Sequence, residues 1–165
     1  MPLAYGLIHP VDLALHSLPP KLQGLRIAHL SDLHIRRRRR RHDMLIRQLT
    51  STKLRLMLAH YPSWLPTAAD MNVDLLFAGH THGGQIRLPN GLTFNNACDL
   101  PRHLSSGILR HRDTLIAISR GLGEVGIPAI NKWRLFCPPH VPIYTLRKGS
   151  TLGVPTQGLM RVVRW

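Results

Sequence analysis

Two histidines stand in a glycine-rich turn that directly follows an apolar run over residues 73–78. The turn reads Gly79-His80-Thr81-His82-Gly83-Gly84-Gln85. A neutral imidazole is a good ligand for borderline divalent metals. Because glycine adopts backbone angles that other residues avoid, both rings can turn toward one point. The turn therefore predicts a site for a metal ion or a phosphate group.

Two further segments carry side chains of the same chemistry. Asp32 and His34 are two residues apart, so on an extended segment both side chains point to the same side. His60 stands directly before a Tyr-Pro pair. Taken alone, either segment also fits a structural role, because buried polar side chains are usually hydrogen-bonded. With the two histidines of the turn they provide one carboxylate and four imidazoles.

Strands are expected to bring these side chains together. Residues 25–31, 53–59 and 73–78 have strand-like patterns, and each run ends directly before one of the groups described above. Residues 63–71 are typical of a short helix, which would join the second and third strands as a parallel pair. Ligands at the carboxyl ends of strands are characteristic of α/β proteins. The pattern therefore predicts an α/β fold around a metal site.

The rest of the chain supplies further elements. Residues 11–15, 114–119 and 141–146 are predicted strands. Residues 86–88 and 92–95 are expected to form a hairpin around Pro89-Asn90-Gly91. Met44, Leu45 and Leu49 recur at helical spacing, which predicts a short helix over residues 43–49. We expect one domain over residues 1–148, shortened near 36–53, and a loosely attached basic tail over 149–165.

Composition restricts the classes of protein and partner. The chain has 165 residues, of which 44% are hydrophobic, and this is enough for one domain with a core. No apolar run approaches the roughly 20 residues that span a bilayer, and residues 1–8 lack the basic leader of a signal peptide. We therefore expect a cytoplasmic protein, or one at the periphery of a membrane. The two cysteines, Cys98 and Cys137, do not make a disulfide framework.

Positive charge dominates the surface chemistry. The formal net charge of +14 favours polyanions such as nucleic acid, anionic lipid or phosphorylated substrates. Six consecutive arginines run from Arg36 to Arg41. This run fits a solvated basic loop and also a phosphate or nucleic-acid contact. No aromatic residue interrupts it, so stacking recognition of nucleic acid is poorly supported.

The motifs, in this order, resemble the calcineurin-like metallophosphoesterase family. The likeness is strongest to its branch of small bacterial phosphoesterases, which keep Gly-Gly-Gln after the histidine turn. It covers about residues 25–34 and 54–146. The segments that carry it are Leu30-Ser31-Asp32-Leu33-His34, His60-Tyr61-Pro62, the turn 79–85, Ser119-Arg120-Gly121-Leu122-Gly123 and Arg134-Leu135-Phe136-Cys137-Pro138-Pro139.

The resemblance implies a fold, a cofactor and roles for particular residues. The fold would be an αββα sandwich, and the cofactor a pair of divalent metal ions that bind the phosphate and supply hydroxide at neutral pH. The implied ligands are Asp32, His34 and His82 for the first ion, and His60 and His80 for the second. His80 and His82 would be the catalytic residues. Gln85 and Arg87, just past the turn, would orient the phosphate.

The sequence departs from the family pattern between His34 and His60. The family has a Gly-Asp motif whose aspartate bridges both metals and a Gly-Asn-His motif that serves the second metal, and neither is present in this interval of 25 residues. Asp43 lies there without the strand and glycine that would direct it. Two cations held close together repel each other, and a bridging carboxylate offsets that repulsion. A single ion at Asp32, His34 and His82 is therefore favoured over a tightly bound pair.

These observations lead to one functional hypothesis and an alternative. The first is a metal-dependent phosphoesterase that hydrolyses phosphoric mono- or diesters, weakened by the missing motifs. The alternative is a non-catalytic remnant that binds a metal or a polyanion. Mn, Fe, Zn and Ni all suit the imidazole-rich ligand set. Expected partners are a phosphorylated small molecule or lipid-linked substrate, nucleic acid through the arginine run, and a second copy of the chain through exposed sheet edges.

Overall fold

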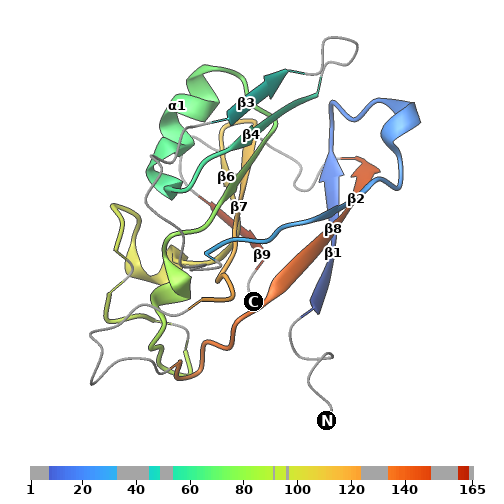
Figure 1. The fold of residues 1–165 in the computed structure, drawn as a ribbon. Coiled ribbons are helices and arrows are strands. Elements are labelled where there is room, and N and C mark those ends of the chain that lie inside the picture. The colour runs from blue at the N-terminus through green and yellow to red at the C-terminus, as the bar shows by residue number, and fades with distance from the viewer. Residues whose placement is uncertain are drawn as a thin grey trace.

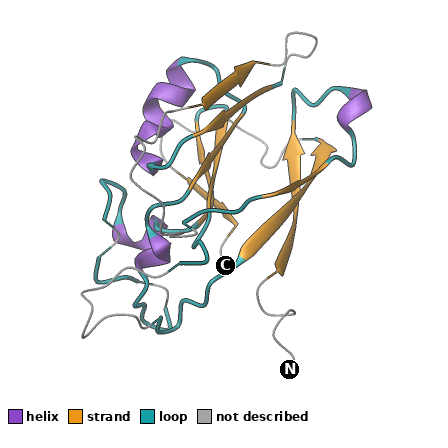
Figure 2. Ribbon diagram, in the orientation of Figure 1, coloured by secondary structure: helices purple, strands orange, loops and turns teal. Residues whose placement is uncertain are grey.

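The fold is a mixed α/β arrangement with two β-sheets and few helices (Figures 1 and 2). It is seen in a computed structural model, which describes residues 8–32, 45–48, 54–90, 92–95, 97–123, 134–149 and 160–163. Two sheets with helix α1 (Leu65–Asp70) confirm the expected α/β class and are compatible with a shortened αββα sandwich.

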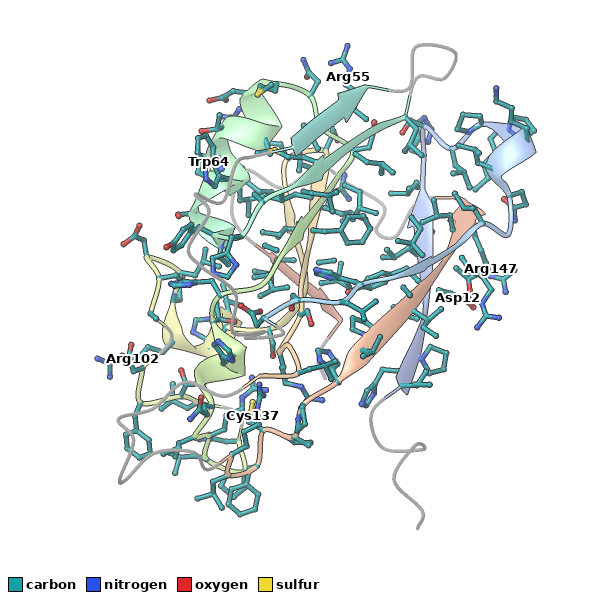
Figure 3. All side chains as sticks on the ribbon, in the orientation of Figure 1. Asp12, Arg55, Trp64, Arg102, Cys137 and Arg147 are labelled. Carbon is teal, nitrogen blue, oxygen red and sulfur yellow. The ribbon has the colours of Figure 1, made fainter. Side chains whose placement is uncertain are left out.

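The smaller sheet has the strand order β1-β8-β2. Its strands are β1 (Ile8–Leu15), β8 (Val141–Lys148) and β2 (Arg26–Ala28). β1 runs parallel to β8, and β2 runs antiparallel to it. Leu13 and Leu15 are buried, whereas Asp12 forms an ion pair of 3.0 Å with Arg147 on the outer face of the sheet (Figure 3). One face of this sheet is therefore turned to the core, as the period of two requires.

The larger sheet has the strand order β3-β4-β5-β7-β6-β9. Its strands are β3 (Leu45–Gln48), β4 (Arg55–Leu58), β5 (Leu75–Ala78), β6 (Gly107–His111), β7 (Thr114–Ile118) and β9 (Met160–Val163). β4, β5 and β7 are parallel neighbours, and β5 is buried along its whole length. The predicted parallel pair joined by a short helix is therefore confirmed.

The two faces of the larger sheet bury two apolar clusters. Leu75 and Phe77 face the smaller sheet, where they meet Leu13, Tyr144 and Leu146. The alternate residues of β5 and β7 face the other way, onto the apolar side of α1. The core therefore consists of a layer between the two sheets and a second layer under α1. Side chains fill the space between the sheets in Figure 3.

Three elements differ from those predicted. Residues 45–48 form strand β3, antiparallel to β4, so the helix predicted over 43–49 is wrong for these residues. Pairing with the neighbouring strand overrides the helical spacing of the leucines. β6 was not predicted. Residues 160–163 form β9, which pairs with β6, so this part of the expected loose tail is a strand of the sheet.

The hairpin chemistry around Pro89 is confirmed, because Leu88 N–H donates to Leu92 O at 2.9 Å and Arg87 faces Thr93 in an antiparallel bridge. Cys98 and Cys137, both among the described residues, form no disulfide. No helix in the described part of the chain is long and apolar enough to cross a membrane.

Candidate metal centre

Three parallel strands of the larger sheet end at one edge, and the candidate site lies there. β4 leads to His60, β5 to Gly79 and His80, and β7 to residues 119–123. Backbone hydrogen bonds continue past the strand ends, from Gly79 N–H to His60 O at 3.1 Å. The segment after β2 joins from the smaller sheet, where Gly123 N–H donates to Asp32 O at 2.7 Å. Loops from both sheets therefore meet at this edge.

Asp32 is the buried centre of this edge. Its side chain is 1% exposed, and both carboxylate oxygens lie 3.1 Å from the backbone N–H of His80. Two glycines make room for it. A Cβ atom on Gly79 would lie 2.3 Å from Asp32 Oδ2, and one on Gly121 would lie 2.6 Å from Asp32 Cβ. The glycine of the histidine turn is therefore required because the carboxylate approaches the backbone there.

Replacing Gly79 by alanine is expected to displace Asp32 from the cluster. Gly79 does not have a left-handed φ, so the cost comes from the contact alone, at about 1–3 kcal/mol of unfolding free energy for an overpacked core position. We expect urea unfolding to detect this loss and dialysed protein to retain less divalent metal. In the control Gly24→Ala, the added Cβ meets nothing within 4 Å but the φ of 82° strains an alanine, so this variant should lose stability while its metal content equals that of the parent.

Three imidazoles surround the carboxylate. His60 Nδ1 and His82 Nε2 lie 3.7 Å and 3.8 Å from Asp32 Oδ1. His60 Nε2 and His80 Nδ1 are 3.2 Å apart. The structure therefore brings together four of the five predicted ligands from three separate segments. Their role as metal ligands stays a prediction. His34, the fifth predicted ligand, lies outside the described residues, as do Asp43 and the arginines from Arg36 to Arg41.

Backbone carbonyls orient two of the rings. His80 Nε2 lies 3.0 Å from Ala97 O, and His82 Nδ1 lies 3.1 Å from Gly123 O. A carbonyl oxygen only accepts, so each of these ring nitrogens carries the proton in its hydrogen bond. In the neutral ring, the other nitrogen then has its lone pair directed into the cluster. Metal-binding histidines are held in this way in proteins.

The backbone is strained at the same residues. Asp32, His80, His82 and Gln85 have φ angles of 50°, 67°, 49° and 54°. Residues other than glycine rarely adopt this left-handed backbone region, and each such residue costs about 1–3 kcal/mol of conformational strain. Strain concentrated in this way is characteristic of functional sites, where the surrounding structure holds it in place.

The donor set fits a divalent metal ion in kind but not in its arrangement. One carboxylate and several imidazoles suit Zn, Fe, Mn and Ni. Ligand atoms bonded at about 2.1 Å lie about 3.0–3.4 Å from each other, whereas Asp32 Oδ1 lies 3.7 Å from His60 Nδ1 and 3.8 Å from His82 Nε2. Among the described residues, no group of three such side chains already has the convergent arrangement of a metal site, since His60 and His80 face each other.

Arg134 connects the loops around His82 by hydrogen bonds. Its guanidinium donates to the carbonyl oxygens of Arg120 at 2.9 Å and Cys137 at 3.3 Å, and also to Gly123 O, the acceptor of the His82 ring. The Cys137 thiol, which is fully buried, donates to His82 O at 3.3 Å. The segment from Arg134 to Cys137 therefore positions the histidine turn from behind.

Replacing Arg134 by methionine is expected to destabilise the chain by about 3 kcal/mol, because several carbonyls lose a charged donor. Lysine should restore less than half of the loss, since an ammonium group cannot reach carbonyls in several directions as a planar guanidinium does. Urea unfolding measures both variants. Arg102→Met, at an exposed arginine, is the matched control and should leave the free energy of unfolding within about 0.5 kcal/mol of the parent.

Other residues around the turn differ in accessibility. Arg87, predicted to orient a phosphate, is only 4% exposed and lies near the equally buried Arg120. Gln85 is half-buried at the end of the turn. The roles predicted for both stay predictions. Tyr61 was not singled out, although its ring lies 4.2 Å from that of His80 and it is 44% exposed. Its position beside His60 in the sequence is the signal that could have identified it.

Comparison with known proteins supports the resemblance seen in the motifs. The chain is 30% identical over 103 residues to the uncharacterized metallophosphoesterase YkuE of Bacillus subtilis, covering 61% of this chain and 33% of YkuE. It is 36% identical over 73 residues to YkoQ of the same organism, covering 44% of this chain and 27% of that protein.

It is also 35% identical over 94 residues to phosphodiesterase YaeI of Escherichia coli, covering 56% of this chain and 32% of that protein. The chain thus spans about a third or less of the length of these relatives. No family model and no solved structure matches it. These matches, together with a buried aspartate among histidines at the ends of strands, support a relationship to the calcineurin-like metallophosphoesterases.

Proposed function

We propose that the chain is a metal-dependent phosphoesterase that hydrolyses phosphoric mono- or diesters. The observation that carries the proposal is the pair of rings whose outer nitrogens are hydrogen-bonded to carbonyls, while the inner nitrogen of His82 lies next to the buried Asp32 and that of His80 lies next to His60. Asp32, His60, His80 and His82 would hold the metal. A bound divalent cation supplies Lewis acidity and hydroxide at neutral pH.

The protein's own residues perform the remaining tasks. His80 and His60 are partly exposed, so the substrate meets the cluster from their side, whereas Asp32 and His82 lie behind them. The ring of Tyr61 packs against both of these partly exposed imidazoles. The excess of positive charge draws an anionic ester toward the site.

Hydrolysis of a chromogenic phosphodiester tests this proposal. We expect turnover that requires Mn, Fe, Zn or Ni, stops on chelation and returns when the metal is added back. The double variant His80→Ala/His82→Ala should lose the activity, while His16→Ala, at an exposed histidine on the turn after β1, should retain it. Turnover that survives chelation would contradict the proposal. A stoichiometric metal with no turnover would favour a non-catalytic metal-binding protein instead.

A further inference from the structure

Five large apolar side chains are exposed on one side of the candidate site. We call them the apolar rim: Leu88, Leu92, Phe94, Leu135 and Phe136, which are 40%, 42%, 64%, 52% and 61% exposed. They come from the hairpin that follows the histidine turn and from the segment that begins at Arg134. Contiguous apolar surface of this kind on a protein usually marks an interaction site.

Hydrogen bonds place the members of the rim side by side. Leu88 N–H donates to Leu92 O at 2.9 Å, which joins the two arms of the hairpin. Leu135 bridges to the first arm in parallel, with Leu135 N–H donating to Gln85 O at 3.0 Å. Leu88, Leu92 and Leu135 thus belong to a small ribbon made of three chain segments, and Phe136 follows Leu135 at its edge.

The alternation of burial shows which way this face points. Arg87 and Thr93 are directly opposite each other and are 4% and 2% exposed. Because side chains alternate along extended chain, the residues on either side of this pair point the opposite way. Leu88, Leu92 and Phe94 therefore project outward together, and the ribbon is anchored to the protein by its other face.

Phe136 is held in the rim at a cost. Its φ angle is 50°, which a bulky side chain rarely adopts, and its ring is exposed to water. The next residue, Cys137, is fully buried and bonded to the backbone of His82. A strained backbone therefore exposes this phenyl ring directly beside the residue that contacts the histidine turn.

Charge identifies the kind of partner. The chain carries a net charge of +14, so a second copy would be repelled and an anionic surface attracted. The exposed Arg102 is joined to the anchored face of the ribbon, where its carbonyl accepts a hydrogen bond from Thr93 Oγ1. Exposed apolar side chains on a strongly basic chain are the combination that binds the interface of an anionic bilayer.

We propose that the apolar rim docks the protein on a membrane surface rich in anionic phospholipid and so holds the candidate site over lipid headgroups. The rim is close to that site, because the loop between Phe94 and Arg102 supplies the Ala97 carbonyl that orients His80. The identity of the substrate rests on the proposed phosphoesterase function: it is then the phosphoester of a membrane amphiphile. The docking itself does not depend on catalysis.

Flotation with vesicles tests the docking. The parent is expected to float with vesicles of equimolar phosphatidylglycerol and phosphatidylcholine, more weakly at high salt, and hardly at all with phosphatidylcholine alone. The variant Leu92→Ser/Phe94→Ser should partition about tenfold less, since two large apolar side chains are no longer transferred from water to the membrane. The control Ile8→Ser/Met71→Ser removes two exposed apolar side chains outside the rim and should bind like the parent.

Hydrogen exchange of the parent provides a test without a substitution. We expect the anionic vesicles to protect residues 86–95 and 134–137. Parent protein that floats with neither vesicle, a rim variant that floats as well as the parent, or a rim that pairs two copies of the chain in sedimentation equilibrium without vesicle binding would each overturn the proposal.

Site variants separate the docking from the chemistry. His80→Ala/His82→Ala should float like the parent, and Leu92→Ser/Phe94→Ser should hydrolyse the soluble chromogenic ester like the parent while its KM for vesicle-borne phosphoester rises. Vesicle binding without any hydrolysis would retain the docking and contradict the phosphoesterase function. Hydrolysis of the soluble ester without vesicle binding would do the reverse.

Discussion

Replacing Asp32 by asparagine is expected to abolish metal-dependent hydrolysis. Losing a group that only orients a metal ligand costs about ten- to a hundredfold in affinity or activity. Asp32 is the one carboxylate in the described cluster, so its loss should cost at least about a hundredfold. Initial rates on a chromogenic phosphodiester at saturating metal measure the effect. Asp99→Asn, at an exposed carboxylate, is the control and should change nothing.

The same substitution should change stability in a way that depends on metal. Without metal, Asp32 is a carboxylate with 1% exposure, so the neutral asparagine should be at least as stable. With metal, the parent gains stability by mass action and the variant does not, by about 2.7 kcal/mol at a concentration one hundred times Kd. Thermal unfolding with and without metal measures both. An equal metal-induced rise in Tm for parent and variant would show that Asp32 is not a ligand.

Mild acid is expected to destabilise the fold through two buried histidines. Burial lowers the pKa of His29 to about 4, against a smaller opposing effect of Asp32, and burial with nearby Arg120 lowers the pKa of His140 to about 2. The unfolded imidazoles take up protons below about pH 6.5. The folded ones stay neutral there, so the unfolded state binds more protons and stability falls as the pH is lowered.

The loss from pH 6.5 to pH 5 should approach about 2 kcal/mol for each of the two histidines. Urea unfolding across this range measures it. His29→Phe keeps ring contacts with Phe77 and Tyr144, and His140→Asn keeps an acceptor for Arg120 N–H. Each variant should remove part of the slope, whereas His16→Ala should not. A slope that is unchanged in both variants would place the acid sensitivity elsewhere.

Sequence patterns predicted the part of the fold that forms the site. The apolar run 73–78 identified the central strand β5, and the glycine turn after it placed His80 and His82 at the strand end. The end of β4 then supplied His60, as expected for a loop that follows a neighbouring parallel strand, whereas Asp32 follows β2 of the smaller sheet. These predictions depended on local patterns and on the common edge of parallel strands.

The remaining features depend on contacts between distant segments. The spacing of apolar residues near 45–48 fits a helix, and only pairing with β4 makes this segment a strand. Arg134 belongs to a segment that carries the family resemblance. The role of its guanidinium depends on carbonyls from other loops that converge on it. The exposure of Phe136 is also invisible in the sequence, because the residue combines a left-handed backbone angle with a position beside a buried cysteine.

Metal content per chain, measured after dialysis against each candidate divalent ion, decides whether Asp32 and the histidines bind a metal ion. Asp32 and histidines from separate loops should hold one ion per chain, and Asp32→Asn and His82→Ala should each release it while His16→Ala retains it. Parent protein that holds no ion, or site variants that retain as much metal as the parent, would contradict the account.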